Sequence, residues 1–228
     1  PSAATPYLYE VTVTIENVSD AAVDARYRRV MDWDIEPTPF DEFVTIQRAG
    51  ATALLYSSND GFAPSDPLDG PSNLGVENAD VVDYGPDDHG ALFDFGFGSL
   101  EAGASKTFTT YYGAAGTESD ALAALAAVGA EAYSFGQPNT DGGPNLGTPN
   151  TFIFAFEGVG GTPIGTSAGI QLPSIAITKS ASAASVSAGG SVTYTYAVTN
   201  TSLDALLTGI AVSDDKCAPV TLTGGDAD

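Results

Sequence analysis

The amino-acid sequence predicts an all-β protein, in which a β-sandwich with one short helix is followed by a smaller β unit. Segments such as Tyr9–Glu16 alternate apolar and polar residues with the period of a strand. The 228 residues include 26 Gly and 14 Pro, which divide the chain into short elements joined by turns. Hydrophobic residues make up 43% of the chain, enough to build a core.

The first domain, residues 1–157, contains most of the predicted strands. After Tyr9–Glu16 these are residues 25–34, 43–47, 53–57, 79–84, 90–97, 105–112 and 151–156. Each is rich in β-branched or aromatic residues, and turn-forming residues separate them. Residues 58–78 are rich in Asn, Asp, Pro and Gly and are expected to form a long surface loop.

A helix is predicted near residues 118–129. Thr117 and Asp120 have the spacing of a capping box, in which the Thr117 side chain would accept a hydrogen bond from the first turn. Residues 121–128 are strong helix formers, and Gly129 is placed to end the helix. Because a helix of about three turns needs a surface to pack on, we expect it to cover part of a sheet.

Residues 158–173 are rich in Gly, Thr, Ser and Pro and are predicted to be a linker. They lead to the second unit, residues 174–228. This unit opens with a strand at 175–179, and a Ser/Ala/Gly turn is followed by an alternating strand at 191–198.

The composition argues against several classes of function. With 29 acidic and 7 basic residues, the net charge is −22, and the chain lacks the cations that neutralise nucleic-acid phosphates. No apolar run approaches the roughly 20 residues of a membrane helix. His89 is the one histidine and Cys217 the one cysteine, so zinc sites of Cys/His type lack the three or four ligands they need, and Cys–His or Ser–His catalysis would have to use His89 as its only imidazole. We therefore expect a protein that is not an enzyme.

The second unit resembles a known repeat at three segments, Ile177–Lys179, Gly190–Ser202 and Val212–Val220, the last containing Asp-Asp-Lys-Cys at 214–217. In this order they are similar to the conserved repeat domain of large bacterial and archaeal surface proteins, called domain of unknown function eleven. At residues 28–34 and 111–115, the first domain resembles the segment that precedes such repeats in uncharacterised secreted bacterial proteins.

The resemblance implies a secreted, immunoglobulin-like β-sandwich that is used in tandem copies. Such a sandwich has about 100 residues and seven strands. Residues 174–228 are therefore expected to form an incomplete immunoglobulin-like sandwich, completed by a continuation of the chain or by strands of a neighbouring subunit. Cys217 would form a disulfide with a partner beyond Asp228, or would be a free buried cysteine. Lys179 is a candidate for the isopeptide bond of some similar surface sandwiches, or is a solvated lysine.

Two acidic clusters are candidate calcium sites. Asp32, Asp34 and Glu36 surround Trp33, with Asp41 and Glu42 close behind. Four further acidic residues precede His89: Asp80, Asp83, Asp87 and Asp88. Oxygen ligands suit Ca²⁺, which takes about six to eight of them, although neither cluster has EF-hand spacing. The alternative is acidity that only keeps the surface solvated.

The sequence features together favour an extracellular structural protein, such as a subunit of a cell-surface filament, pilus-like appendage or adhesin stalk. Its modules would be joined by β-strand pairing, through self-association or with neighbouring repeat domains. The alternative is a secreted carbohydrate- or calcium-binding module, in which Trp33 would contact sugar unless it belongs to the core. Asn17 and Asn200 begin sequons at predicted turns and are candidate glycosylation sites in a host that glycosylates.

Overall fold

A computed structural model describes residues 1–70, 75–140, 145, 147–165, 175–200, 210–221 and 223–224. The chain divides into two compact units, residues 1–170 and 171–228, which we describe separately. The predicted all-β sandwich fold with one short helix is confirmed. In the described part of the chain, no helix combines the length and the hydropathy needed to cross a bilayer.

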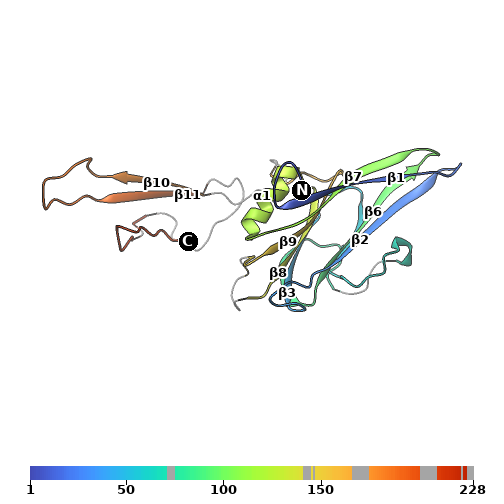
Figure 1. Cartoon of the computed structure of the whole chain (residues 1–228), viewed down its shortest axis with the longest axis horizontal. Coiled ribbons are helices and arrows are strands. Elements are labelled where there is room, and N and C mark those ends of the chain that lie inside the picture. The colour runs from blue at the N-terminus through green and yellow to red at the C-terminus, as the bar shows by residue number, and fades with distance from the viewer. Residues whose placement is uncertain are drawn as a thin grey trace. The chain divides into compact units, whose positions relative to one another are not determined.

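Two antiparallel sheets packed face to face form the first unit (Figure 1). The larger sheet has the order β1 (Leu8–Glu16), β7 (Ser105–Ala115), β9 (Thr151–Glu157), β8 (Ala132–Pro138), β3 (Glu42–Gln47) and β5 (Val81–Asp87). The smaller sheet has the order β2 (Val23–Asp32), β6 (Gly90–Leu100) and β4 (Leu54–Ser58). A short 3-10 helix, Pro67–Asp69, lies in the connection between β4 and β5.

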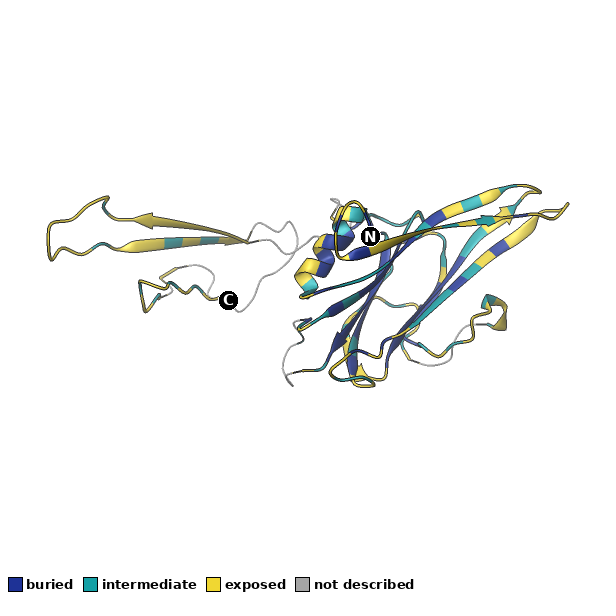
Figure 2. Cartoon of the chain, in the orientation of Figure 1, coloured by how far each residue is buried: buried dark blue, intermediate teal, exposed yellow. Residues whose placement is uncertain are grey.

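An aromatic cluster fills the space between the two sheets. Phe93 and Phe95 of β6 meet Phe154 and Phe156 of β9, and the Phe95 and Phe156 ring centroids are 4.7 Å apart. All four side chains are fully buried, and Figure 2 shows buried residues concentrated on the inner strands of this unit. Each such burial stabilises the fold by about 1.5–3 kcal/mol, so this cluster contributes substantially to the first unit's stability.

The helix α1 (Glu118–Val128) has the predicted caps. The Asp120 N–H donates to Thr117 Oγ1 at 3.1 Å, and Gly129 ends the helix in the left-handed conformation at φ 66°. Leu122 and Leu125 are buried where α1 packs on β9 and β7. The helix therefore covers one face of the larger sheet, as expected.

The structure differs from the sequence prediction at two places in the first unit. It contains β8, which the sequence patterns did not predict. In addition, residues 158–165, expected in the linker, pack on the first unit. Val159 and Ile164 are 1% and 2% exposed, and the Ile164 N–H donates to the Ala130 carbonyl oxygen at 2.9 Å. Residues 166–173 of the predicted linker lie outside the described residues.

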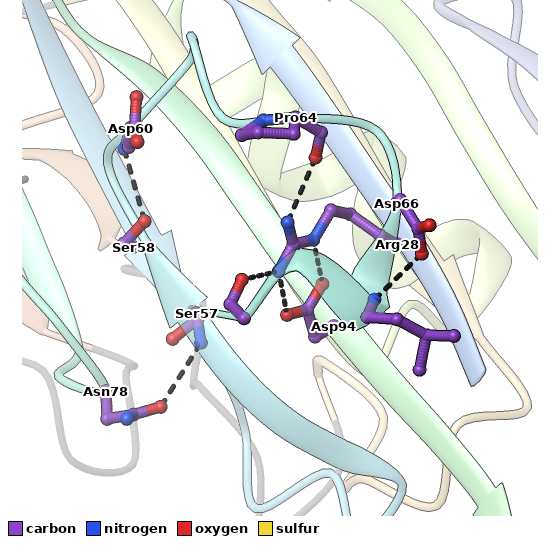
Figure 3. Close-up of polar contacts among 10 residues, drawn as sticks. Arg28, Ser57, Ser58, Asp60, Pro64, Asp66, Asn78 and Asp94 are labelled. Atoms are coloured by element: carbon purple, nitrogen blue, oxygen red, sulfur yellow. Dashed lines mark hydrogen bonds and ion pairs between the residues drawn. The ribbon is translucent and has the colours of Figure 1, made fainter. Parts of the chain in front are cut away.

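A buried ion pair fixes the connection between β4 and β5 against the outer face of the smaller sheet (Figure 3). Arg28 of β2 and Asp94 of β6 form two hydrogen bonds, Nε to Oδ1 at 2.6 Å and Nη2 to Oδ2 at 2.7 Å. The same guanidinium donates to the carbonyl oxygens of Pro64 at 2.9 Å and Gly70 at 2.6 Å. Two bonds from the charged guanidinium, to Pro64 and Gly70, thus hold this connection in place, and the two bonds to Asp94 fix the guanidinium itself.

The described part of the second unit contains a single hairpin, β10 (Ile175–Ala181) and β11 (Tyr194–Asn200). The register runs from Ile175 opposite Asn200 to Ala181 opposite Tyr194. Residues 210–221, which the structure describes, contain no strand. Figure 2 shows that every residue of the two strands is exposed or half-buried.

Candidate functional site

Three aspartates meet where β2 ends and β6 begins. Asp32 pairs with Gly90 in the β2–β6 register, and the Trp33 N–H donates to the His89 carbonyl oxygen at 3.1 Å. Continuing this register places Asp34 opposite Asp88. One carboxylate oxygen of each of Asp32, Asp34 and Asp88 lies within 4.8 Å of those of the other two. We call these three exposed residues the aspartate cluster.

Asp32 shows the electrostatic cost of this arrangement. Partial burial raises the pKa of Asp32, and the negative charges of Asp34 and Asp88 raise it as well. The backbone of Gly61 also approaches closely, because a Cβ atom at Gly61 would lie 2.9 Å from Asp32 Oδ1. The connection held by Arg28 therefore begins beside the aspartate cluster.

The structure does not bring the other four predicted ligands into this group. Asp80 Oδ1 accepts from the Arg48 N–H at 2.9 Å, and Asp83 Oδ1 accepts from Asn145 Nδ2 at 3.0 Å. Asp87 Oδ1 accepts from the N–H of Asp88 at 3.0 Å. Glu36 is exposed between β2 and β3. Among the described residues, the aspartate cluster is the one group of three or more potential ligands close enough to share an ion.

Glu42, which the sequence analysis placed at the end of the first acidic cluster, is buried in the structure. It begins β3, is 0% exposed, and neither of its carboxylate oxygens has a hydrogen-bond partner. Burial first, together with the charges of Asp88, Asp34 and Asp32, raises the pKa of Glu42 to about 7. The signal was in the sequence: Glu42 shares the period-two phase of Val44 and Ile46, which belong to the core.

His89, beside Asp88, is a buried imidazole. It is 3% exposed, and burial lowers its pKa against the opposing effect of Asp87 and Asp88. Asn59 Oδ1 accepts from the Val76 N–H at 2.6 Å, so Asn59 Nδ2 donates to His89 Nδ1 at 2.8 Å. The remaining proton is on Nε2, which has no partner in the described structure.

Trp33 lies in the core, which removes the main feature of the carbohydrate-binding alternative. Trp33 is 4% exposed, and its Nε1–H donates to Ser134 Oγ at 3.2 Å. An open depression of about 400 Å³ does lie over β5 and includes Tyr84, Asp87 and His89. That depression is separate from the Trp33 ring, so no tryptophan platform faces it.

In the second unit, Asp214 connects the segment after the hairpin to the hairpin itself. Its Oδ2 accepts from Lys179 Nζ at 2.5 Å and from the Tyr196 hydroxyl at 2.6 Å. Its Oδ1 accepts from the N–H groups of Lys216 at 2.8 Å and Cys217 at 2.9 Å. These bonds, that to Lys179 first, lower the pKa of Asp214. The Asp-Asp-Lys-Cys segment is thereby fastened to β10 and β11.

These contacts place two further predicted site residues. The Lys179 ammonium contacts a carboxylate and lies 4.6 Å from the Tyr194 ring centroid, so it is an ion-paired lysine. The isopeptide bond at Lys179, with its expected partner beyond residue 228, stays a prediction. Cys217 is a half-buried free thiol, and its disulfide with a partner outside the sequence also stays a prediction.

The two predicted glycosylation sites differ. Asn17 is 4% exposed, and its Nδ2 donates both hydrogens, to the carbonyl oxygens of Ala21 at 2.8 Å and Leu100 at 2.7 Å. In the folded protein this amide is therefore buried and hydrogen-bonded, and glycosylation at Asn17 stays a prediction. Asn200 ends β11 and is exposed, while Ser202 of its sequon lies outside the described residues.

No protein-family model, curated protein or solved structure matches this chain. Functional conclusions therefore rest on the residues and contacts described above.

Proposed function

We propose that this chain is a structural module of an extracellular or cell-surface protein, a subunit of a filament, pilus-like appendage or adhesin stalk. In this proposal the modules are joined by β-strand pairing, and no residue has a catalytic role. The observation that carries the proposal is the β10–β11 hairpin, which presents an apolar face and one unpaired edge on each strand in the described structure.

The two faces of the hairpin differ in chemistry. Because directly opposed residues of an antiparallel pair point to the same face, one face collects large side chains. These are Ile175, Ile177, Tyr194, Tyr196 and Val198. The other face carries small or polar residues: Ala176, Thr178, Ser180, Thr195, Ala197 and Thr199. A strand pair with one apolar face has the pattern of one layer of a sandwich, which a second layer covers.

In the described structure the large residues of this face are left exposed, which supports the proposal that a further layer covers them. Ile175 is 53% exposed, Ile177 57% and Tyr194 41%. A two-stranded hairpin is at best marginally stable in water, and three or more strands or a packing partner are needed. Further strands from a second copy or from a neighbouring repeat domain would supply both the missing edge bonds and the missing layer.

The first unit, in contrast, has its own core. The chain as a whole is strongly acidic. A net charge of −22 opposes non-specific association between copies, so association has to depend on a specific surface. The hairpin offers such a surface, because the large side chains of its apolar face are exposed. Lys179 points to the same face, and its charge is paired with that of Asp214. The proposal therefore assigns cohesion to the second unit and rigidity to the first.

The test is the mass of the chain in solution as a function of concentration, with electron microscopy of the same samples. We expect oligomers or filaments that Ile177→Lys disrupts. Thr178→Lys, on the opposite face of the same strand, is the matched control and should leave association unchanged. A wild-type chain that stays monomeric at all concentrations and forms no filaments would contradict self-association, as would equal effects of the two variants.

A further inference from the structure

The aspartate cluster has the spacing of ligands around one ion. Calcium binds carboxylate oxygens at about 2.3–2.6 Å, so two oxygens on the same ion are at most about 5 Å apart. The oxygens of Asp32, Asp34 and Asp88 already lie within 4.8 Å of one another. These side chains could therefore share an ion without rearrangement of β2 or β6.

The protein supplies no positive charge to this cluster. Like charges this close repel one another, and one carboxylate oxygen of each of the three aspartates lies within 4.8 Å of those of the other two. In the described structure, each of the seven basic side chains has another partner. The pairs are Arg26 with Asp24, Arg28 with Asp94, Arg29 with Tyr112, Arg48 with Asp80, Lys106 with the Phe97 ring, Lys179 with Asp214, and Lys216 with Asp215. None of these partners belongs to the aspartate cluster.

Glu42 is an independent indication of a ligand. A fully buried carboxylate without a hydrogen-bond partner is rare, because burying such a group is costly. Glu42 approaches from β3 of the larger sheet, whereas Asp32 belongs to β2 of the smaller sheet. Glu42 pairs with Asp87 in the β3–β5 register, directly before Asp88, and the charges of Asp88, Asp34 and Asp32 act on its carboxyl group, so Glu42 lies beside the cluster.

We propose that the aspartate cluster binds a calcium ion, with Asp32, Asp34 and Asp88 as ligands and Glu42 as the inner carboxylate that completes its negative field. The donors are all hard oxygens, which favour calcium over zinc or copper. The nearby imidazole is not available through Nδ1, which accepts from Asn59. The ligands lie at the end of β2, in the smaller sheet, and directly after β5, in the larger sheet, so the bound ion joins the two sheets. This site is independent of the structural role proposed for the second unit.

The test uses the full chain after treatment with a chelator, with Tb³⁺ as the probe and Ca²⁺ as the competitor. Trp33 lies between Asp32 and Asp34 in the sequence and is the one tryptophan, so excitation of Trp33 should sensitise Tb³⁺ luminescence. We expect saturation at one ion per chain and displacement of Tb³⁺ by Ca²⁺. Asp34→Asn should weaken binding about tenfold or more, and Glu42→Gln about tenfold, as loss of a supporting group does.

Glu36→Gln is the matched control, because Glu36 is an exposed acid close to Asp34 that does not belong to the cluster. It should leave the affinity unchanged. Asp88→Asn provides a second ligand variant from the other strand, and Trp33 emission without ion reports whether each variant is folded. Absence of saturable binding, lack of displacement by Ca²⁺, or equal weakening by Glu36→Gln and the two Asp variants would overturn the proposal.

Discussion

Replacing Glu42 by Gln should flatten the pH dependence of the protein's stability. Folding raises the pKa of the Glu42 carboxyl group from its ordinary value of 4.5 to about 7, chiefly because the group is buried. An acid whose pKa is raised by folding destabilises the folded state when it ionises. Stability contributed by protonated Glu42 is therefore complete below about pH 4.5 and is lost as the pH rises to about 7.

The magnitude follows from the two pKa values. At about 1.4 kcal/mol per pKa unit, the difference between 4.5 and about 7 corresponds to about 3 kcal/mol of unfolding free energy at alkaline pH. Part of this difference is already present at pH 5. Between pH 5 and pH 8, Glu42 should therefore lower the unfolding free energy of the ion-free wild type by about 2.5 kcal/mol.

The assay is urea unfolding in EDTA at both pH values, followed by the fluorescence of the buried Trp33. Glu42→Gln keeps the side-chain shape without the charge, so the variant should lack this decrease, whereas the control Glu36→Gln should retain it. Comparing the pH 5 and pH 8 values within each variant removes the cost of burying the new amide. If Glu42→Gln loses as much stability as the wild type between the two pH values, the reasoning about this buried carboxylate is wrong.

Three other substitutions test further parts of the structure. Arg28→Ala leaves the carboxylate of Asp94 buried and unpaired and should lower the unfolding free energy by about 3–5 kcal/mol. Arg26→Ala, which removes an exposed ion pair, is the control and should lower it by about 0–1 kcal/mol. Urea unfolding measures both. Thr117→Ala removes the helix cap and should cost about 1 kcal/mol in the same assay, and an unchanged midpoint would contradict the cap. Asp214→Asn weakens the contacts that hold residues 214–217, so a thiol reagent should modify Cys217 faster than in the wild type. An equal rate would show that these contacts do not protect the thiol.

Local patterns in the sequence predicted most of the secondary structure. The helix was found with both caps because Thr117, Asp120 and Gly129 act within one turn of the helix ends. Strand β8 was missed, although Tyr133 and Phe135 alternate within it, because a glycine and a proline at its end resemble a loop. The position of residues 158–165 depends on contacts with residues far away in the chain, such as the bond from Ile164 to Ala130.

The candidate ion site could be predicted only in part for the same reason. Sequence patterns identified Asp32, Asp34 and Asp88 as acidic residues of two separate clusters. The β2–β6 pairing, which ends at Asp32 and Gly90, brings Asp88 close to Asp32 and Asp34, whereas Asp80 and Asp83 have other partners. Burial of Glu42 depends on the packing of the two sheets, and no local pattern shows that its carboxylate lacks a partner.

The order of strands in the larger sheet determines when the first unit is able to fold. Leu8 pairs with Gly113, and Glu42 pairs with Pro138, so early strands wait for partners that are synthesised much later. β9 joins β7 to β8, and without it the larger sheet is divided in two. Chains dominated by such distant pairings fold slowly, on a scale of roughly milliseconds to seconds. We expect a nascent chain that ends before Thr151 to remain unfolded, with Phe93 and Phe95 open to proteases and chaperones, until the last strand of the unit has been made.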